Sequence, residues 1–557
     1  IDVANNVDFK LIDKMAMNLG FEYNNEKRIK SGIKYAISKA TANGHCAVLE
    51  DELYRFIKVL LGVENDEIED SVIELKAKGE IVIEEREDNN WIYLDSYYKA
   101  EENVANKLIT LDKARNMKHI NDFEDELEKI EQKTDLILSD KQKEAIEAVN
   151  DNNVCIITGG PGTGKTTIIK VILELYKSKK RKTVLCAPTG RAAKRMTETT
   201  GEEAKTLHRL LEIGKIEEER TSKYNDFDVA PLDADVIIVD EMSMVDLFLM
   251  NYLVKAIYQG SKLVLVGDVD QLPSVGPGNV LADLINSKRI KTIVLNKIFR
   301  QAAKSKIIIN SHRVNSGETF IKPQESAEEL NQDFFYIKEN NQDKILNQIL
   351  SLCSGRLESY GNYEFFKSIQ VITPTKKGML GTKELNKVLQ ECLNPLPEGG
   401  LERQNLGASF RAGDRVMQIK NNYDIFWERE KYGYETGNGV FNGEFGTILK
   451  LDDIEKRVKI KFDDEKYAWY QYSELDQIEH AYAITVHKAQ GSEFDVVIMP
   501  IVQAAPMLLT RNLLYTGMTR AKKMLIIVGN ANVIEYMINN ADNKKRNTGL
   551  EYKLKNM

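Results

Sequence analysis

The chemistry-bearing stretch with the clearest spacing is GGPGTGKTT, residues 159–167. A glycine, four further residues and then Gly164, Lys165 and Thr166 follow the order of a phosphate-binding loop. An apolar strand pattern precedes the loop and a helical pattern follows it. Backbone N–H groups can therefore curl around phosphates at a helix N-terminus, where the helix dipole favours negative charge. We expect Lys165 to reach the β- and γ-phosphates of a nucleoside triphosphate and the Thr166 hydroxyl to hold Mg²⁺.

Two adjacent carboxylates end a second apolar strand pattern, in DVIIVDEMSM. We expect Asp240 to bind Mg²⁺ through water and Glu241 to orient or deprotonate an attacking water. A third strand leads into GDVDQLPSVGPG, where the amide of Gln271 can hydrogen-bond the γ-phosphate or its water. Together with the phosphate loop, the two carboxylates favour hydrolysis over transfer to a small substrate.

The elements that must position these groups are short β-branched strands alternating with helices, the pattern of parallel sheets covered on both faces. One such set lies in residues 134–303, and a second lies in 304–405 and 476–545. Between the two parts of the second set, residues 406–475 read as short alternating strands with glycine turns, which predicts an all-β insert. Residues 1–130 are mainly amphipathic helix followed by one hairpin pattern, which favours a winged-helix-like module and leaves a bracing helical scaffold as the alternative.

Composition indicates a soluble globular protein of several domains. The chain has 557 residues, a net charge of −8 and 42% hydrophobic residues, and no apolar run approaches the roughly 18 residues that cross a bilayer, so no membrane contact is expected. Five scattered cysteines without a Cys-x-x-Cys pair indicate neither a disulfide framework nor a zinc site, as in a reducing cytoplasm. Since the first residue is Ile1, we expect a fragment of a longer product. Nucleic-acid binding would need a local basic groove, and a solvated helix end is the alternative reading for the first five of its candidate residues. The candidates are Lys177, Lys179, Lys180, Arg181, Lys182, Arg191, Lys194 and Arg195.

The order of the motifs resembles the superfamily 1 helicases. GDVDQLPSV follows IIVDEMSM and precedes KIFRQ, and the later stretches YAITVHKAQGSEFD and RNLLYTGMTRAKK also match that pattern. Within the superfamily, CAPTGRAAKRM, TLHRLL, GVFNGEFGTI and AYAITVHKAQGSEFD resemble the RecD-type helicases, in particular the stand-alone bacterial form with an extended N-terminal region. The match runs over residues 134–545, and a weaker one reaches the helix-hairpin-helix segment near the N-terminus, where Asn6, Val7 and Asp8 stand in place of the Gly-Ile-Gly that the family tends to carry.

The resemblance implies an α/β fold class with two RecA-like parallel-sheet motor domains, an all-β small-barrel insert of Src-homology-3 type and a mainly helical N-terminal region. We call the motor domains 1A (134–303) and 2A (304–405 and 476–545). The insert (406–475) is called the barrel. ATP and Mg²⁺ are the implied cofactors, with Thr166 and Asp240 as metal-binding residues. The resemblance places Gln142 at the adenine edge. The implied nucleotide-binding residues are Gln142, Gly160, Pro161, Gly162, Thr163, Gly164, Lys165, Thr166, Thr167, Gly491 and Glu493.

The resemblance also implies the remaining catalytic and strand-binding residues. Arg300 in IFRQ and Arg520 in YTGMTRA are expected to place guanidinium groups on the developing γ-phosphate charge, which couples closure of the cleft to hydrolysis. With them, the expected catalytic set is completed by Lys165, Glu241 and Gln271. The residues expected to contact single-stranded DNA are Pro188, Thr189, Arg191, Thr206, His208, Thr485 and His487.

The activity implied is ATP-dependent translocation from 5′ to 3′ on single-stranded DNA with duplex separation at single-strand/duplex junctions, in DNA repair or recombination, by a cytoplasmic monomer. A β-hairpin pin (1B) is expected within residues 213–231, and Tyr467, Trp469, Tyr470 and Tyr472 could either stack on bases or fill the barrel core. Three alternatives stay open: a translocase without strand separation, an ATP-gated clamp, and an RNA helicase, because strand contacts go mostly to phosphate and sugar.

Overall fold

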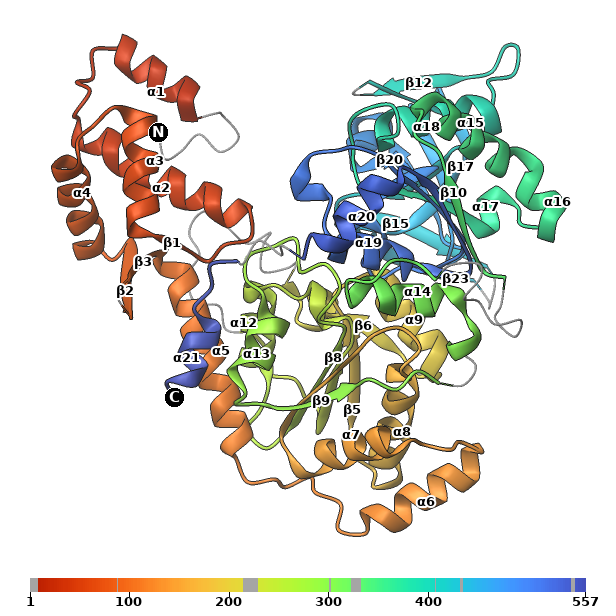
Figure 1. Cartoon of the computed structure of the whole chain (residues 1–557), viewed down its shortest axis with the longest axis horizontal. Coiled ribbons are helices and arrows are strands. Elements are labelled where there is room, and N and C mark those ends of the chain that lie inside the picture. The colour runs from red at the N-terminus through yellow and green to blue at the C-terminus, as the bar shows by residue number, and fades with distance from the viewer. Residues whose placement is uncertain are drawn as a thin grey trace.

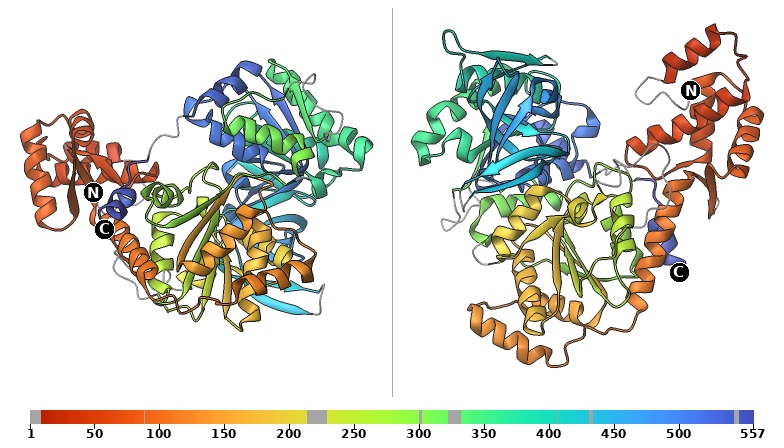
Figure 2. Two further views of the ribbon diagram at one scale, coloured as in Figure 1. Left: turned by 60° about the horizontal axis from the view of Figure 1, so that its bottom comes forward. Right: turned by 180° about the vertical axis from the view of Figure 1, so that it is seen from behind.

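The computed structural model describes residues 9–87, 89–213, 229–299, 302–321, 332–405, 407–430, 434–541 and 546–557. Three predictions fall wholly or mostly outside these ranges. They concern the pin in residues 213–231, Arg300, and the N-terminal positions 6–8, and the roles of these residues stay predictions. Figures 1 and 2 show motor domain 1A in the middle, the N-terminal helices standing out on one side, and motor domain 2A with the barrel on the other.

Motor domain 1A is built on a parallel sheet with the order β6-β5-β7-β8-β4-β9. Its strands are runs of valine, isoleucine and leucine, the composition expected where both faces are covered. In chain order they are β4 (Val154–Gly159), β5 (Thr183–Ala187), β6 (Ala204–Thr206), β7 (Val236–Val239), β8 (Lys262–Gly267) and β9 (Lys291–Leu295). One face packs against α6 (Phe123–Thr134), α7 (Asp140–Asp151), α8 (Lys165–Ser178) and α9 (Gly190–Thr200).

The other face of this sheet packs against helices from three parts of the chain. Two belong to 1A, α12 (Leu247–Ala256) and α13 (Val280–Ser287), and the short α10 (Leu207–Leu210) joins them. The others are α5 (Asp95–Lys113), from the region that we predicted to be separate, and α21 (Leu550–Lys555), which lies along α5 in Figure 1. The predicted boundary near residue 130 therefore falls after a helix that already belongs to the core of 1A, because the apolar face of α5 is needed to cover the sheet.

Motor domain 2A holds a second parallel sheet, ordered β10-β23-β22-β11-β21. The strands are β10 (Phe334–Lys338), β11 (Ile369–Thr373), β21 (Ala483–Thr485), β22 (Phe494–Ile501) and β23 (Ala521–Gly529). One face packs on α14 (Lys306–Asn315), α19 (Arg511–Met518) and α20 (Ala531–Asn539). The other packs on α15 (Gln342–Ser351), α16 (Leu357–Gly361), α17 (Phe365–Ser368) and α18 (Thr382–Leu393). Two doubly covered parallel sheets confirm the predicted fold class.

The barrel is an antiparallel sheet ordered β16-β15-β19-β18-β17-β14-β20. Its strands are β14 (Arg415–Gln418), β15 (Asn422–Arg429), β16 (Glu435–Val440), β17 (Phe445–Asp452), β18 (Arg457–Phe462), β19 (Tyr467–Gln471) and β20 (Ile478–His480), and a hairpin of β12 (Glu402–Asn405) and β13 (Ala408–Arg411) precedes them. The sheet extends past the predicted end at residue 475, because β20 pairs antiparallel with β14.

Alternation along β19 separates the barrel aromatics. Tyr470 is fully buried, and its hydroxyl donates to Gln418 Oε1 at 2.9 Å. Trp469 faces the other way, with the Arg457 guanidinium 4.0 Å from its ring. The role of filling the core therefore falls to Tyr470, while Tyr467, Trp469 and Tyr472 are partly exposed.

The N-terminal region contains the small sheet β1-β3-β2 and four helices with a core of their own. In chain order these are α1 (Phe9–Asn18), α2 (Glu26–Ala42), β1 (Ala47–Leu49), α3 (Glu50–Leu61), α4 (Asn65–Ala77), β2 (Ile81–Arg86) and β3 (Asn89–Leu94). The order from α2 to β3 is that of a winged-helix module. We call residues 9–94 the N-terminal module.

Residues 546–557, which we call the tail, hold the N-terminal module and α5 against 1A. The side chain of Glu101 is almost fully buried, and its carboxylate lies 3.0 Å from Lys553 Nζ and accepts the Gly549 N–H at 2.8 Å. Arg546 donates to the carbonyls of Ser274, Gly276 and Gly278 in 1A, at 2.6 to 2.8 Å.

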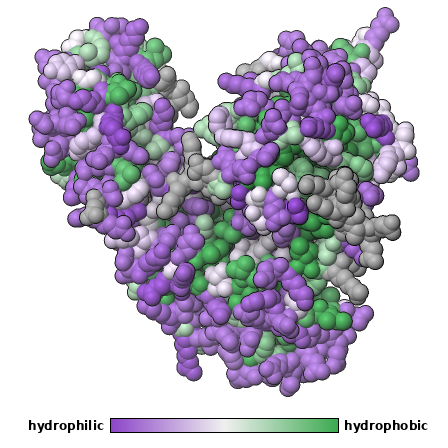
Figure 3. Space-filling model, viewed as in Figure 1, coloured by the Kyte–Doolittle hydropathy of each residue, from purple (hydrophilic) through white to green (hydrophobic). Residues whose placement is uncertain are grey.

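Within the described ranges, no helix combines the length and the apolar character needed to span a membrane. The face drawn in Figure 3 is mostly hydrophilic, and hydrophobic residues appear mainly towards its middle.

Candidate nucleotide and nucleic-acid site

The phosphate loop joins the end of β4 to the start of α8. Gly162 and Gly164 have φ angles of +73° and +81°, which L side chains rarely adopt, so glycine is required for this turn. Lys165 Nζ lies over the loop, 3.0 Å from the carbonyl oxygen of Gly160, and the Thr163 hydroxyl donates to the same carbonyl at 2.8 Å. The loop therefore offers a glycine cradle and a cation at a helix N-terminus, which suits a polyphosphate.

Gln142 gives an independent test of the fit to a nucleotide. Its side-chain oxygen accepts the Ser139 N–H at 3.0 Å in the capping box of α7, and the residue is 1% exposed. Its Nε2 is buried and finds no acceptor among the described residues, and a Cβ added at Gly164 would lie 2.5 Å from it. A buried donor without an acceptor beside the phosphate loop fits a ligand that supplies one, as the predicted adenine contact requires.

The two carboxylates lie at the end of β7. The Glu241 N–H donates to Asp240 Oδ1 at 2.8 Å, and Glu241 has a φ of +54°, a strained value for a residue with a side chain. Burial and the adjacent Glu241 carboxylate raise the pKa of Asp240 to about 6, against the opposing effect of Lys165 and Arg195. An Asp that is costly to ionise without a cation suits the binding of Mg²⁺, and a fixed, strained Glu suits the orientation of water.

Motor domain 2A reaches this site through Arg520. The guanidinium is 2% exposed, and its Nη2 donates to Gln271 Oε1 of 1A at 3.0 Å. The Tyr515 hydroxyl of α19 donates to Asp268 Oδ2 of 1A at 2.7 Å, and the Leu272 N–H donates to the Thr516 hydroxyl at 2.9 Å. The loop that contains Gln271 is therefore bonded to the helix that precedes Arg520, and the two predicted catalytic residues meet across the domain boundary.

Two of the predicted strand-binding residues, Thr189 and Thr206, also cap the helices that follow them. The side chain of Thr189 accepts from Ala192 N–H and caps α9, and that of Thr206 accepts from Arg209 N–H and caps α10. Pro188 precedes Thr189 at the end of β5, so these groups lie at the carboxyl edge of the 1A sheet. His208 is half-buried near Asp246, whose pKa burial raises.

In 2A, Thr485 ends β21 and His487 follows it. His487 is exposed and lines a cleft of about 750 Å³ together with Gln271 of 1A, and desolvation by the surrounding protein, with Lys376 and Arg546 nearby, lowers the pKa of His487. Ser243 also lines this cleft, and its hydroxyl, on a residue 8% exposed, has no partner among the described residues. The cleft thus offers hydrogen-bonding groups from both motor domains.

Arg191, a candidate for the predicted basic groove, is engaged in contacts between domains. Its guanidinium packs against the rings of Phe445 and Phe494, 4.8 Å and 4.4 Å from their centroids, and donates to the Glu493 carbonyl at 3.2 Å. Burial lowers the pKa of Arg191 to about 10. In this arrangement Arg191 joins 1A to the barrel and 2A, and its contact with DNA stays a prediction.

The rest of the predicted basic groove is largely neutralised. Lys179 pairs with Asp122 and Lys182 with Asp233, each at 2.6 Å. These pairs agree with the alternative reading of a solvated helix end for this part of the run.

Two further predicted nucleotide-binding residues, Gly491 and Pro161, lie where 1A and 2A approach each other closely. A Cβ added at Gly491, which has a φ of +68°, would lie 2.7 Å from the Thr189 hydroxyl oxygen, so glycine lets 2A approach 1A here. Pro161 of the phosphate loop presents its carbonyl oxygen 3.2 Å from His312 Nε2 of α14. Thr166 and Thr167 are partly exposed in the first turn of α8.

Sequence reasoning missed several residues that meet at this boundary. They are Asp268, His312, Gln490, Tyr515 and Thr516. Asp268 and Tyr515 stand three and five residues from Gln271 and Arg520, so proximity to those predicted residues was the available signal. His312 lies in a stretch that matches no motif, and no signal for it exists in the sequence.

A phosphate loop on one parallel sheet, faced by a buried arginine from a second, gives the chain the architecture of the two-domain nucleoside triphosphatases. Four family models match it: the AAA domain over residues 142–277, the UvrD-like helicase C-terminal domain over 480–528, the ATP-dependent RecD-like DNA helicase SH3 domain over 385–462, and the ATP-dependent RecD2 DNA helicase HHH domain over 1–47. The chain belongs to the RecD-like helicases, which confirms the resemblance seen in its motifs.

Similar proteins include the ATP-dependent RecD2 DNA helicase of Deinococcus radiodurans, 36% identical over 71% of this chain and 49% of the relative. The RecBCD enzyme subunit RecD of Mycobacterium tuberculosis is 29% identical over 79% of this chain and 76% of the relative. The chain thus spans about half the length of the Deinococcus relative. Among solved structures, Bacteroides Pif1 bound to single-stranded DNA has a TM-score of 0.41 and 19% identity, covering 70% of this chain and 92% of the other.

Proposed function

We propose that this chain is the motor of an ATP-dependent DNA helicase that moves from 5′ to 3′ on single-stranded DNA and separates duplex. The observation that carries the proposal is the bond between Arg520 of 2A and Gln271 of 1A, 3.0 Å long and buried. A residue that stabilises phosphoryl transfer and a residue that senses the γ-phosphate are then held by opposite domains. Hydrolysis in such a site is coupled to the relative position of the domains, which is what a translocating motor requires.

The chemistry of ATP hydrolysis is assigned to residues of 1A. Lys165 binds the β- and γ-phosphates, and Thr166 and Asp240 hold Mg²⁺, which neutralises phosphate charge when it is bound. Glu241 orients the attacking water, and Gln271 contacts the γ-phosphate or that water. Gln142 supplies a donor to the adenine edge. The glycine cradle, the buried Gln142 Nε2 that has no acceptor among the described residues, and the raised pKa of Asp240 support this assignment.

The strand is proposed to cross the carboxyl edges of both sheets. On 1A it would contact Thr189 and Thr206, and on 2A it would contact Thr485 and His487. The cleft that His487 lines also contains the Ser243 hydroxyl, for which the described part of the chain offers no partner, and this supports a strand running between the two sets. Direction from 5′ to 3′ is proposed from membership of the RecD-like family.

The biological setting is proposed on the same basis. Relatives named as RecD2 helicase and as a RecBCD subunit favour DNA repair or recombination for this chain. Single-strand/duplex junctions are the proposed substrate. A cytoplasmic location and a monomeric state stay predictions.

The test is strand displacement with ATP and Mg²⁺ on two duplexes, one with a 5′ tail and one with a 3′ tail. We expect displacement of the 5′-tailed duplex only, with Lys165→Ala as the inactive control. Displacement of the 3′-tailed duplex alone would contradict the direction. ATP turnover that is stimulated by single strands without any displacement would indicate a translocase or a clamp, and a preference for RNA tails would indicate an RNA helicase.

A further inference from the structure

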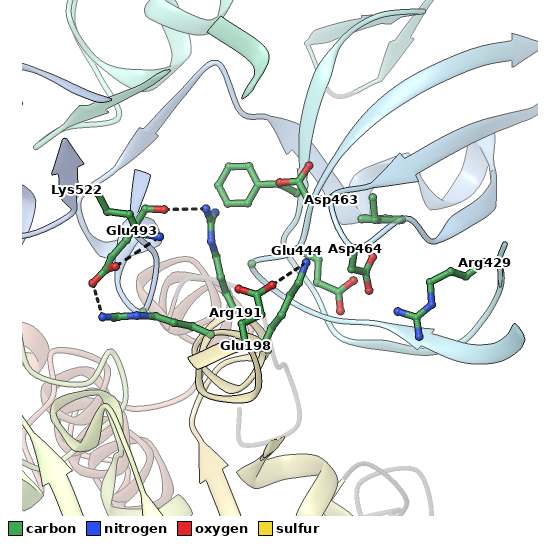
Figure 4. Close-up of a pocket in the computed structure, with 15 residues that line it drawn as sticks. Arg191, Glu198, Arg429, Glu444, Asp463, Asp464, Glu493 and Lys522 are labelled. Atoms are coloured by element: carbon green, nitrogen blue, oxygen red, sulfur yellow. Dashed lines mark hydrogen bonds and ion pairs between the residues drawn. The ribbon is translucent and has the colours of Figure 1, made fainter. Parts of the chain in front are cut away.

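A charged cavity of about 360 Å³ lies where α9 of 1A meets 2A and the barrel (Figure 4). Side chains from all three domains line it, including Arg191 from 1A, Glu444 from the barrel, and Glu493 and Lys522 from 2A. Arg195, on the same helix as Arg191, also lines this cavity. Among the basic side chains that line the cavity, Arg195 is the one for which the described contacts include an ion pair with the hydrolytic carboxylate Glu241.

Arg195 stands between two carboxylates of different domains. Its Nη2 lies 2.6 Å from Glu493 Oε1 of 2A, and its Nη1 lies 3.7 Å from Glu241 Oε1 of 1A. Lys522 Nζ lies 3.8 Å from the other oxygen of Glu493. A chain of alternating charges therefore runs from the water-orienting carboxylate, through Arg195, into 2A.

Arg191 fixes the helix from which Arg195 extends. It lies one turn earlier on α9, and its guanidinium packs against the rings of both Phe445 and Phe494. Because it also donates to the main-chain carbonyl of Glu493, α9 is bonded to Glu493 at both the backbone and the side chain. The place of the Arg195 guanidinium is thus set by the second motor domain as much as by its own helix.

We propose that Arg195 is a positioning residue for Glu241, and that it transmits the position of 2A to the hydrolytic carboxylate. A guanidinium is a rigid planar fork, so a displacement of Glu493 that turns one nitrogen also moves the other. Glu241 has a strained backbone and its carboxylate must point at the water, and the ion pair with Arg195 acts directly on that carboxylate. The proposal rests on the proposed ATP hydrolysis and adds to it the device by which closure of the domains aligns the reacting groups.

The first experiment compares single-turnover ATP hydrolysis and nucleotide binding in the full chain for wild type, Arg195→Ala and Arg195→Lys. A misplaced catalytic group costs up to about 100-fold in rate, so we expect Arg195→Ala to slow hydrolysis by about 10- to 100-fold with unchanged nucleotide affinity. Arg195→Lys keeps the charge but not the fork, and an intermediate rate is expected. Lys170→Ala, which removes an exposed cation from α8, is the matched control and should keep the wild-type rate.

The second experiment asks whether Arg195 acts through Glu241. In a Glu241→Gln background, removal of Arg195 should leave the residual turnover unchanged, because the group that it positions is already lost. Multiplication of the two separate losses would overturn the proposal, as would a wild-type rate in Arg195→Ala, or a loss confined to nucleotide affinity and thermal stability. If wild type itself fails to hydrolyse ATP, the proposed function fails; if wild type is active and Arg195→Ala equals it, only this inference fails.

Discussion

Replacement of Arg520 by alanine separates two roles that its contacts allow. The guanidinium donates from Nε to the Thr516 carbonyl at 3.0 Å, from Nη1 to the Ser492 carbonyl at 3.2 Å, and from Nη2 to Gln271 Oε1 at 3.0 Å. It could therefore act on the phosphate as an arginine finger, or it could only hold Gln271 in place. The two roles differ in the size of the loss that they predict.

The magnitude follows from what each role supplies. An arginine finger contributes about 10³ to 10⁵ in rate, which is about 4 to 7 kcal/mol of the activation free energy. Loss of a buried hydrogen bond that leaves Gln271 Oε1 without its donor, while Nε2 still donates to Asp268, costs about 1 to 3 kcal/mol, or roughly 5- to 150-fold if all of it appears in the rate. Hydrolysis slowed by about 10³-fold or more therefore requires the finger role, and a smaller loss is explained by the position of Gln271.

The assay is single-turnover hydrolysis of ATP in the presence of single-stranded DNA, with nucleotide binding measured in parallel. We expect Arg520→Ala to bind nucleotide as wild type does and to hydrolyse it at least about 10³-fold more slowly. Thr519→Val is the matched control, since it removes one acceptor of Arg520, the Thr519 hydroxyl at 3.1 Å, and keeps the guanidinium. A higher KM with a normal kcat in Arg520→Ala would refute the finger role.

Four further outcomes are expected. Lys165→Ala should abolish ATP turnover and leave the thermal unfolding profile unchanged; persistent turnover would mean that the nucleotide site is elsewhere. Deletion of residues 214–230 should keep DNA-stimulated ATPase and lose strand displacement, whereas normal displacement would reject the pin. Burial raises the pKa of Asp283 to about 8, from about 3.9 in the unfolded chain, so the wild-type protein loses stability as the pH rises between these two values. The gain in melting temperature on Asp283→Asn should therefore grow from about pH 5 to about pH 8.5. A gain that does not depend on pH would contradict the pKa shift. Lys553→Met should lower the unfolding free energy by about 3 to 5 kcal/mol by leaving Glu101 buried and unpaired, and adding Glu101→Gln should recover part of it in chemical denaturation.

Local features of the site could be predicted because their physics is local. The strand, glycine turn and helix around Lys165 lie within a short stretch, and the pair Asp240 and Glu241 ends a strand whose apolar run is visible in the sequence. The fold class could be predicted for the same reason, from the alternation of strands and helices. The roles assigned to these residues stay predictions until the variants are measured.

Contacts between distant parts of the chain could not be predicted from the sequence. Arg520 and Gln271 are 249 positions apart, and the motifs gave each a role without showing that they bond to each other. Arg191 and Arg195 belong to a basic run, and a run of charge does not reveal whether its members meet solvent, two phenylalanine rings or a carboxylate from another domain. Likewise α5 has the amphipathic pattern of any surface helix, and the sheet that it covers cannot be identified from periodicity alone.

The ion pair between Glu101 and Lys553 can form only after the ribosome has synthesised nearly the whole chain. The two residues are 452 positions apart, so at about 5 to 20 residues per second a ribosome needs roughly 20 to 90 s to deliver the second after the first. Through that interval the carboxylate of Glu101 and the apolar face of α5 lack the cover that Leu550 and Leu554 later provide. Both motor domains are translated meanwhile. The nascent chain must therefore tolerate an uncovered flank on its first motor domain until the tail has emerged.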